Sequence, residues 1–227
     1  MNQAPSSVLV SYPEQAAFGR TLPKSKIYEH SGANTRLKDL FVKQVEQIVW
    51  QYKLAPETIN LPARPGVPEI QIFRLQLKTP ELHRDVLRCI DGAVQFPILF
   101  ELTFGERTQV VAAYKRPSEA ASDRWTISDY FASGWLSADL PRAPMPIALN
   151  LGRLYEQLLT PLIPLPARPR ESLADLVERT GKVQAMRREV DKTVARLEKE
   201  RQFNRKVEIN AAVRELRHQL RLLETNE

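Results

Sequence analysis

Hydrophobic and polar residues alternate most regularly between Glu69 and Lys78, in the stretch EIQIFRLQLK. A period of two residues places successive side chains on opposite faces and predicts a β-strand. Two further apolar stretches, PILFELTF and TQVVAAYK, flank the short segment GER and predict a β-hairpin. The stretch RWTISDYFASGWL predicts one or two additional strands.

Other segments of the chain have apolar residues at helical spacing. A helix capped by Asn34 or Thr35 and running through Tyr52 is predicted by apolar residues that share one face: Leu37, Leu40, Phe41, Ile48 and Tyr52. Thr79 and Pro80 open a second predicted helix, with Gly92 as its C-cap. The stretch IALNLGRLYEQLL predicts a third helix, which ends before Pro161. These elements predict an α+β fold, in which helices cover a mixed, mostly antiparallel sheet.

Prolines divide the chain. The stretch PLIPLPARPR, residues 161–170, is incompatible with a helix or a central strand and predicts an extended spacer. We therefore predict an α+β domain over residues 1–160, a proline-rich spacer over 161–170 and a helical tail over 171–227.

The tail contains two apolar stripes that do not lie on one face of a continuous helix. At 100° per residue, Met186, Val190, Val194 and Leu197 centre near about 340°, whereas the stripe formed by Ile209, Val213, Leu216, Leu220 and Leu223 centres near about 80°. A coiled-coil-like hairpin that turns at Gln202–Arg205 would bring the stripes together and let Phe203 cover the bend. The alternative is one long helix that exposes Phe203, since neither Gly nor Pro marks a turn there.

Length and composition narrow the class of protein. The 227 residues suffice for one sizeable core, or one core with an appendage. No apolar stretch has the length of a membrane span, and the first residues lack the pattern of a signal peptide. The single cysteine, Cys89, excludes an internal disulfide, and three histidines with one cysteine argue against a zinc site. We expect a cytoplasmic protein without a cofactor or a membrane partner.

The net charge of +6 is a weak signal of nucleic-acid binding, because the excess is spread along the chain. Residues 170–227 carry 14 basic and 11 acidic side chains, and the remaining residues carry 19 and 16, so each part has a net charge of +3.

Several longer stretches resemble a bacterial family of unknown function, DUF4391. They are LPKSKIYEH, VWQYKLAPETIN, EIQIFRLQLK, VLRCIDGAVQFPILFEL, AAYKR and RQFNRKVEIN, between Leu22 and Asn210. The resemblance implies a companion of helicases and DNA methyltransferases in restriction-type or phage-defence gene clusters. It provides no catalytic residues that could be transferred to this chain.

A restriction-type nuclease core is the most specific enzyme hypothesis for this sequence. Its candidate residues are Asp91, Glu101 and Lys115, although Ala113 stands where such a core needs a carboxylate. If Phe104 pairs with Thr108, Glu101 and Lys115 share a face but lie about 13 Å apart. A shift of one residue would place them on opposite faces. Local ion pairs or hydrogen bonds of Glu101 and Lys115 are the alternative interpretation.

Candidate contacts with nucleic acid or an acidic partner lie mainly in the tail. A basic row opposite the first apolar stripe consists of Arg188, Lys192, Arg196 and Lys199. Phe203, Arg205 and Lys206 follow, and Lys24 and Lys26 occupy a predicted loop. The alternative is a solvated face with local ion pairs.

The function that we predict from the sequence is a non-catalytic accessory or assembly subunit of a DNA-directed complex of the restriction or phage-defence type. Its partners would be a helicase, a DNA methyltransferase or both, and nucleic acid is a further candidate. A divergent metal-dependent nuclease and a free-standing nucleic-acid-binding protein are the alternatives.

Overall fold

The computed structural model describes residues 8–118 and 125–225. The chain divides into two compact units, Met1–Leu162 and Ile163–Glu227. The first unit is an α+β unit, and the second contains two helices that pack as a hairpin. Both features confirm the predicted fold class. Among the described residues, no helix is both long and apolar enough to cross a membrane.

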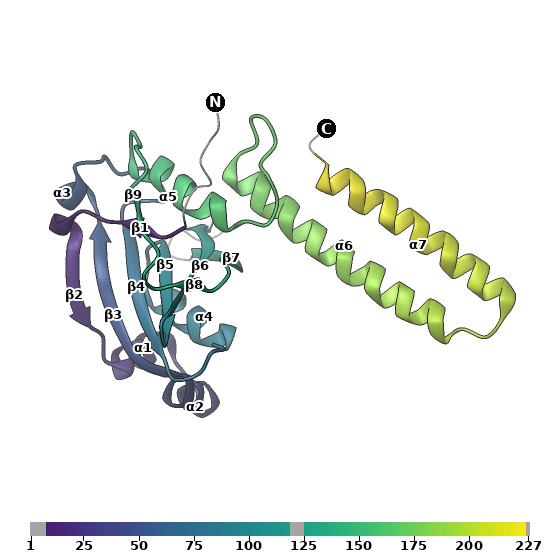
Figure 1. Cartoon of the computed structure of the whole chain (residues 1–227), viewed down its shortest axis with the longest axis horizontal. Coiled ribbons are helices and arrows are strands. Elements are labelled where there is room, and N and C mark those ends of the chain that lie inside the picture. Colours follow the sequence, from purple (N-terminus) through teal and green to yellow (C-terminus); the bar gives the residue numbers. More distant parts are fainter. Residues whose placement is uncertain (1–7, 119–124, 226–227) are drawn as a thin grey trace. The chain divides into compact units, whose positions relative to one another are not determined.

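The α+β unit is built on a mixed sheet (Figure 1). Within the described residues its strand order is β2 (Ala17–Thr21), β3 (Val45–Leu54), β4 (Ile70–Leu77), β5 (Ile98–Phe104), β6 (Arg107–Pro117) and β7 (Trp125–Ala132), with β8 (Leu136–Ser137) also paired to β6. All pairs are antiparallel except β4 and β5, which the helix α4 (Arg84–Ala93) connects. A separate parallel pair joins β1 (Val10–Ser11) to β9 (Ala143–Pro144).

Both faces of the sheet are buried. One face packs against α1 (Lys24–Ser31), α2 (Thr35–Gln44) and α4 through a cluster that includes Phe41, Phe73, Ile90 and Phe100. Strand residues of opposite parity, such as Leu99 and Val110, are buried on the other face, where α5 (Leu151–Leu159) packs against β6. The short helices are η1 (Glu14–Ala16), α3 (Pro56–Ile59) and η2 (Thr160–Leu162).

The first predicted helix is only half as long as expected. Asn34 caps α2 as predicted, because its side chain accepts a hydrogen bond from the backbone N–H of Leu37 at 2.9 Å. The helix ends at Gln44, however, and residues up to Leu54 form β3. This segment is rich in β-branched and aromatic residues and pairs with β2 and β4, so long-range pairing overrides its local helical spacing.

The bounds of α4 also differ from the prediction. The helix begins at Arg84, after His83, whose imidazole accepts a hydrogen bond from the N–H of Asp85 at 3.2 Å. It continues through Gly92 to Ala93, so Gly92 is an interior residue and not the C-cap.

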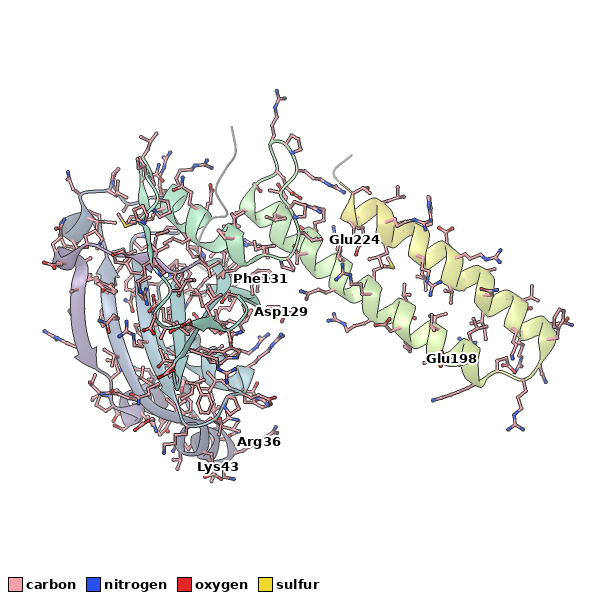
Figure 2. All side chains as sticks on the ribbon, in the orientation of Figure 1. Arg36, Lys43, Asp129, Phe131, Glu198 and Glu224 are labelled. Atoms are coloured by element: carbon pink, nitrogen blue, oxygen red, sulfur yellow. The ribbon has the colours of Figure 1, made fainter. Side chains whose placement is uncertain are left out.

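The helical hairpin consists of α6 (Leu173–Lys199) and α7 (Phe203–Glu224). Figure 2 shows side chains projecting around it, with Glu198 near the turn and Glu224 at the opposite end. The turn lies at residues 200–202, earlier than predicted. The carboxylate of Glu200 accepts hydrogen bonds from the backbone N–H groups of Arg201 and Gln202, at 2.8 and 2.9 Å, so a side chain closes a turn without Gly or Pro.

Phe203 is the first residue of α7 and is 78% exposed. The prediction that it covers the bend is therefore wrong. The helices pack instead through interior residues of the stripes, among which Val190, Ile209 and Val213 are buried.

Two arginines stabilise the open end of the hairpin. Arg179 donates hydrogen bonds to the carboxylate of Glu171 at 2.6 and 2.8 Å and to the carbonyl of Leu223 at 3.1 Å. Arg168, inside the predicted spacer, donates to the carbonyls of Leu222 and Thr225, both within 2.9 Å. Cations at the last carbonyls of α7 compensate for the hydrogen bonds that a helix C-terminus lacks.

Candidate functional site

Lys115 has a buried ammonium group. The residue lies on β6, is 1% exposed and reaches the C-terminal end of α4. Its Nζ donates hydrogen bonds to the main-chain carbonyls of Asp91, at 2.5 Å, and of Val94. These carbonyls lie where a helix has no backbone donors of its own, so Lys115 caps α4.

Asp91 completes this buried network. One oxygen of its carboxylate accepts a hydrogen bond from the hydroxyl of Tyr130 at 2.5 Å, and the other lies 3.5 Å from Nζ of Lys115. Burial raises the pKa of Asp91 and lowers the pKa of Lys115, and each shift is opposed by the charge of the other group. The ammonium group of Lys115 and the carboxylate of Asp91 thus bind groups within the fold. For Lys115 this agrees with the alternative interpretation of an ion pair or hydrogen bond within the protein.

Glu101 lies on the opposite face of the sheet. Its neighbours on β5, Phe100 and Leu102, belong to the helix-covered core, so its own side chain points away from α4. The buried carboxylate accepts two hydrogen bonds from Arg142, at 2.7 and 2.9 Å, and lies 3.6 Å from a nitrogen of Arg74. Glu101 therefore also has the local ion pair that the alternative interpretation requires.

The register of the β5–β6 hairpin explains this separation. Phe104 pairs with Arg107 and not with Thr108. Because side chains alternate along a strand, this difference of one residue places Glu101 and Lys115 on opposite faces. The structure thus brings Asp91 and Lys115 together but does not bring Glu101 to them. Among the described residues, no three or more His, Cys, Asp or Glu side chains are arranged to hold a metal ion.

The two basic residues near the N-terminus lie on a helix and not on the predicted loop, since LPKSKIYEH contributes α1. Lys24 donates hydrogen bonds to the carbonyls of Phe41 and Val45, at 3.2 and 2.5 Å, and burial lowers its pKa. Lys26 is exposed and pairs with Glu29 at 3.1 Å. Lys24 thus caps the end of α2, and only Lys26 remains on the surface.

The predicted basic row lies on the surface of α6. Its four members, Arg188, Lys192, Arg196 and Lys199, are all exposed. Lys192 is 3.8 Å from Glu189, a surface pair that contributes little to stability. The row is available for contacts, but it also fits the alternative of a solvated face.

The hairpin end, residues 199–207, combines an exposed aromatic ring with basic side chains. It carries four basic residues and one acidic residue: Lys199, Arg201, Arg205 and Lys206, against Glu200. All four basic residues are exposed, as are Phe203 and Val207. The sequence pointed to Lys199, Phe203, Arg205 and Lys206. It did not single out Arg201, whose place at the turn depends on the observed bounds of the helices.

A shallow apolar groove runs between α6 and α7. Its volume is about 450 Å³, and it is lined by Lys182, Ala185, Met186, Glu189, Leu216 and Leu223. Met186 and Leu216 were members of the two predicted stripes. The sequence did not reveal that part of each stripe remains uncovered, because the number of helices that pack together cannot be read from a stripe.

Comparison with known proteins identifies a family. The family model described as "Domain of unknown function (DUF4391)" matches residues 10–220 of this chain. No curated protein matches the chain, and no solved structure does.

Proposed function

We propose that this chain, which belongs to the DUF4391 family, is a non-catalytic accessory subunit of a DNA-directed complex in the cytoplasm. In this proposal the hairpin docks a larger partner, a helicase or a DNA methyltransferase of a restriction-type or phage-defence system. The class of partner comes from the family resemblance. The docking mode comes from the geometry of the hairpin.

The single observation that carries the proposal is the open apolar groove between α6 and α7. The carboxylates and the lysine that a nuclease would need are held in internal contacts on two faces of the sheet. An apolar groove between two helices can receive the apolar face of a partner helix. The nuclease alternative has no comparable support.

The occupant that we propose for the groove is an amphipathic helix of the larger subunit. The apolar residues of α7 follow the alternating spacing of three and four residues that supports knobs-into-holes packing. Two helices cover each other on one side only, so a third helix can bury Met186, Leu216 and Leu223 in the same way.

The test is co-expression of the full-length chain with each candidate subunit, followed by nuclease treatment and gel filtration. Nuclease treatment prevents DNA from bridging the two proteins. Ala185→Glu places a charge in the groove at an exposed position and should reduce the recovered complex at least about tenfold, a change that corresponds to about 1.4 kcal/mol. Ala195→Glu is the matched control, because Ala195 is also exposed on α6 but does not line the groove.

Equal loss or equal retention of the complex in both variants would contradict docking through the groove. A chain that forms a homodimer on its own, and that Ala185→Glu dissociates, would assign the groove to a second copy and would also contradict the proposal.

A further inference from the structure

Phe203 is a large aromatic residue that is exposed and does not contribute to the buried core of the described residues. Among the large hydrophobic side chains exposed in the described part of the chain, it is the one aromatic residue, and 78% of its surface is accessible. It precedes the first buried residue of α7, Ile209, by more than one helical turn. An aromatic ring held at the start of a helix, away from any core, is a surface suited to stacking.

The charges around Phe203 favour an anionic ligand. Within residues 8–118 and 125–225, none of the side chains of Lys199, Arg201, Arg205 and Lys206 forms an ion pair. The one carboxylate in this segment, that of Glu200, is bound by two backbone N–H groups, which lower its pKa. The hairpin end thus has a net charge of +3.

We infer that the hairpin end binds single-stranded nucleic acid, with Phe203 stacked on a base and the four basic side chains on neighbouring phosphates. The inference deepens the proposed function and rests on it, since it supplies the contact through which an accessory subunit would reach its nucleic acid. Single-strand binding proteins combine aromatic platforms with basic residues in this way, and stacking on a ring tolerates any base.

The ring distinguishes a single strand from a duplex. In a duplex the faces of the bases are already stacked on each other, so Phe203 gains a partner only from an unpaired base. The basic side chains alone would bind both forms through phosphate charge. Preference for the single strand is therefore the property that depends on Phe203.

The test is fluorescence anisotropy of the full-length chain with a labelled oligothymidine and with a duplex of equal length. The wild type should prefer the single strand. Phe203→Ala should weaken single-strand binding about 5- to 140-fold, the range expected for loss of one stacked base. Phe203→Trp should retain the binding. Leu222→Ala is the control and should retain the binding, because Leu222 is an exposed apolar residue of the same helix that lies outside the hairpin end.

A second measurement tests the phosphate contacts. Arg205→Gln should lower the slope of log affinity against log salt by about 0.7, the value for one contact with a single strand. Ala185→Glu, which alters the groove, should leave the affinity for the oligonucleotide unchanged.

The outcomes separate this inference from the proposed function. Equal binding of single strand and duplex, unaffected by Phe203→Ala, would overturn the inference. So would absence of oligonucleotide binding by a wild-type chain that still forms the groove-dependent complex. If Phe203→Ala instead abolished the protein complex and no oligonucleotide bound, the hairpin end would contact protein, and the inference would again fail.

Discussion

The ammonium group of Lys115 and the carboxylate of Asp91 lie 3.5 Å apart in the interior of the α+β unit. Lys115 belongs to β6, whereas Asp91 is close to the end of α4. The pair and the carbonyl contacts of Lys115 thus fix the end of this helix on the sheet. Asp91 and Lys115, which the sequence offered as candidate catalytic residues, thus form contacts that hold the fold together.

Removal of this lysine should destabilise the α+β unit. Lys115→Met leaves the buried carboxylate of Asp91 without its cation and two carbonyls without a donor, so we expect a loss of about 3–5 kcal/mol in the free energy of unfolding. Urea denaturation followed by tryptophan fluorescence measures it. Asp91→Asn combined with Lys115→Met should cost less than the sum of the single changes, because the uncompensated charge is then absent.

Lys43→Met is the control for this prediction, since Lys43 is an exposed lysine at the end of α2. It should change the free energy of unfolding by less than about 0.5 kcal/mol. If Lys115→Met were as mild as Lys43→Met, the structural role assigned to the buried lysine would be wrong.

The helical hairpin should lose stability in acid through Glu171. The hydrogen bonds from Arg179 lower the pKa of this carboxyl in the folded state. A lowered pKa means that the stabilisation is fully present above the unfolded value of about 4.3 and is lost as pH falls through the folded value. The thermal midpoint of the helical circular dichroism signal should fall over that window.

Glu171→Gln should make the hairpin less stable at neutral pH and should remove much of this acid dependence. Glu178→Gln provides the comparison, because Glu178 forms an exposed pair with Lys182 on the same helix. An acid transition that is identical in the wild type and in Glu171→Gln would rule out Glu171 as its cause.

Phe203→Asp should be nearly silent for the stability of the isolated chain. The ring is exposed, so its loss removes little buried area, and a carboxylate in the first turn of α7 interacts favourably with the helix dipole. We expect a change of at most about 0.5 kcal/mol in the free energy of unfolding.

Thermal melts of the wild type and of this variant in parallel provide the measurement. Val213→Asp is the contrasting variant, because Val213 is buried between the helices and a charge there should unfold the hairpin. Strong destabilisation by Phe203→Asp would mean that the ring does seal the turn.

The isolated chain should not cleave DNA with Mg²⁺ or Mn²⁺. Glu101 is separated by the sheet from Asp91 and Lys115, so these residues do not jointly bind a metal ion and activate water. A plasmid-nicking assay with the purified full-length protein measures this. Metal-dependent nicking that disappears in a folded Glu101→Gln variant would contradict the prediction.

The parts of the fold that were predicted correctly depend on local patterns. The alternation in β4, the hairpin of β5 and β6 and the Asn34 cap are properties of neighbouring residues. The helix that was expected to continue to Tyr52 failed because β3 is selected by pairing with β2 and β4, which are distant in sequence.

The candidate site residues also depend on contacts between distant parts of the sequence, which local patterns do not reveal. Lys24 was predicted to be a surface contact, and Lys115 was a candidate for the nuclease alternative or for a local ion pair or hydrogen bond. Both cap helices through carbonyls that lie 17 to 24 residues away in the sequence. The stripes of the tail correctly favoured a hairpin. The sequence linked exposure of Phe203 only to the long-helix alternative. Its exposure within a hairpin could not be foreseen, because it depends on a turn that the side chain of Glu200 closes.

The pairing of β1 with β9 delays the folding of the first strand until late in the synthesis of the α+β unit. Arg142 binds both the carbonyl of Val10 and the carboxylate of Glu101, and 132 residues separate it from Val10. At about 5–20 residues per second, a ribosome needs about 7 to 26 s to add that length of chain. During this interval the strand at Val10 has no partner. Glu101 lacks the cation of Arg142 only for the last 41 residues of it. The nascent α+β unit therefore depends on late residues to pair its earliest strand.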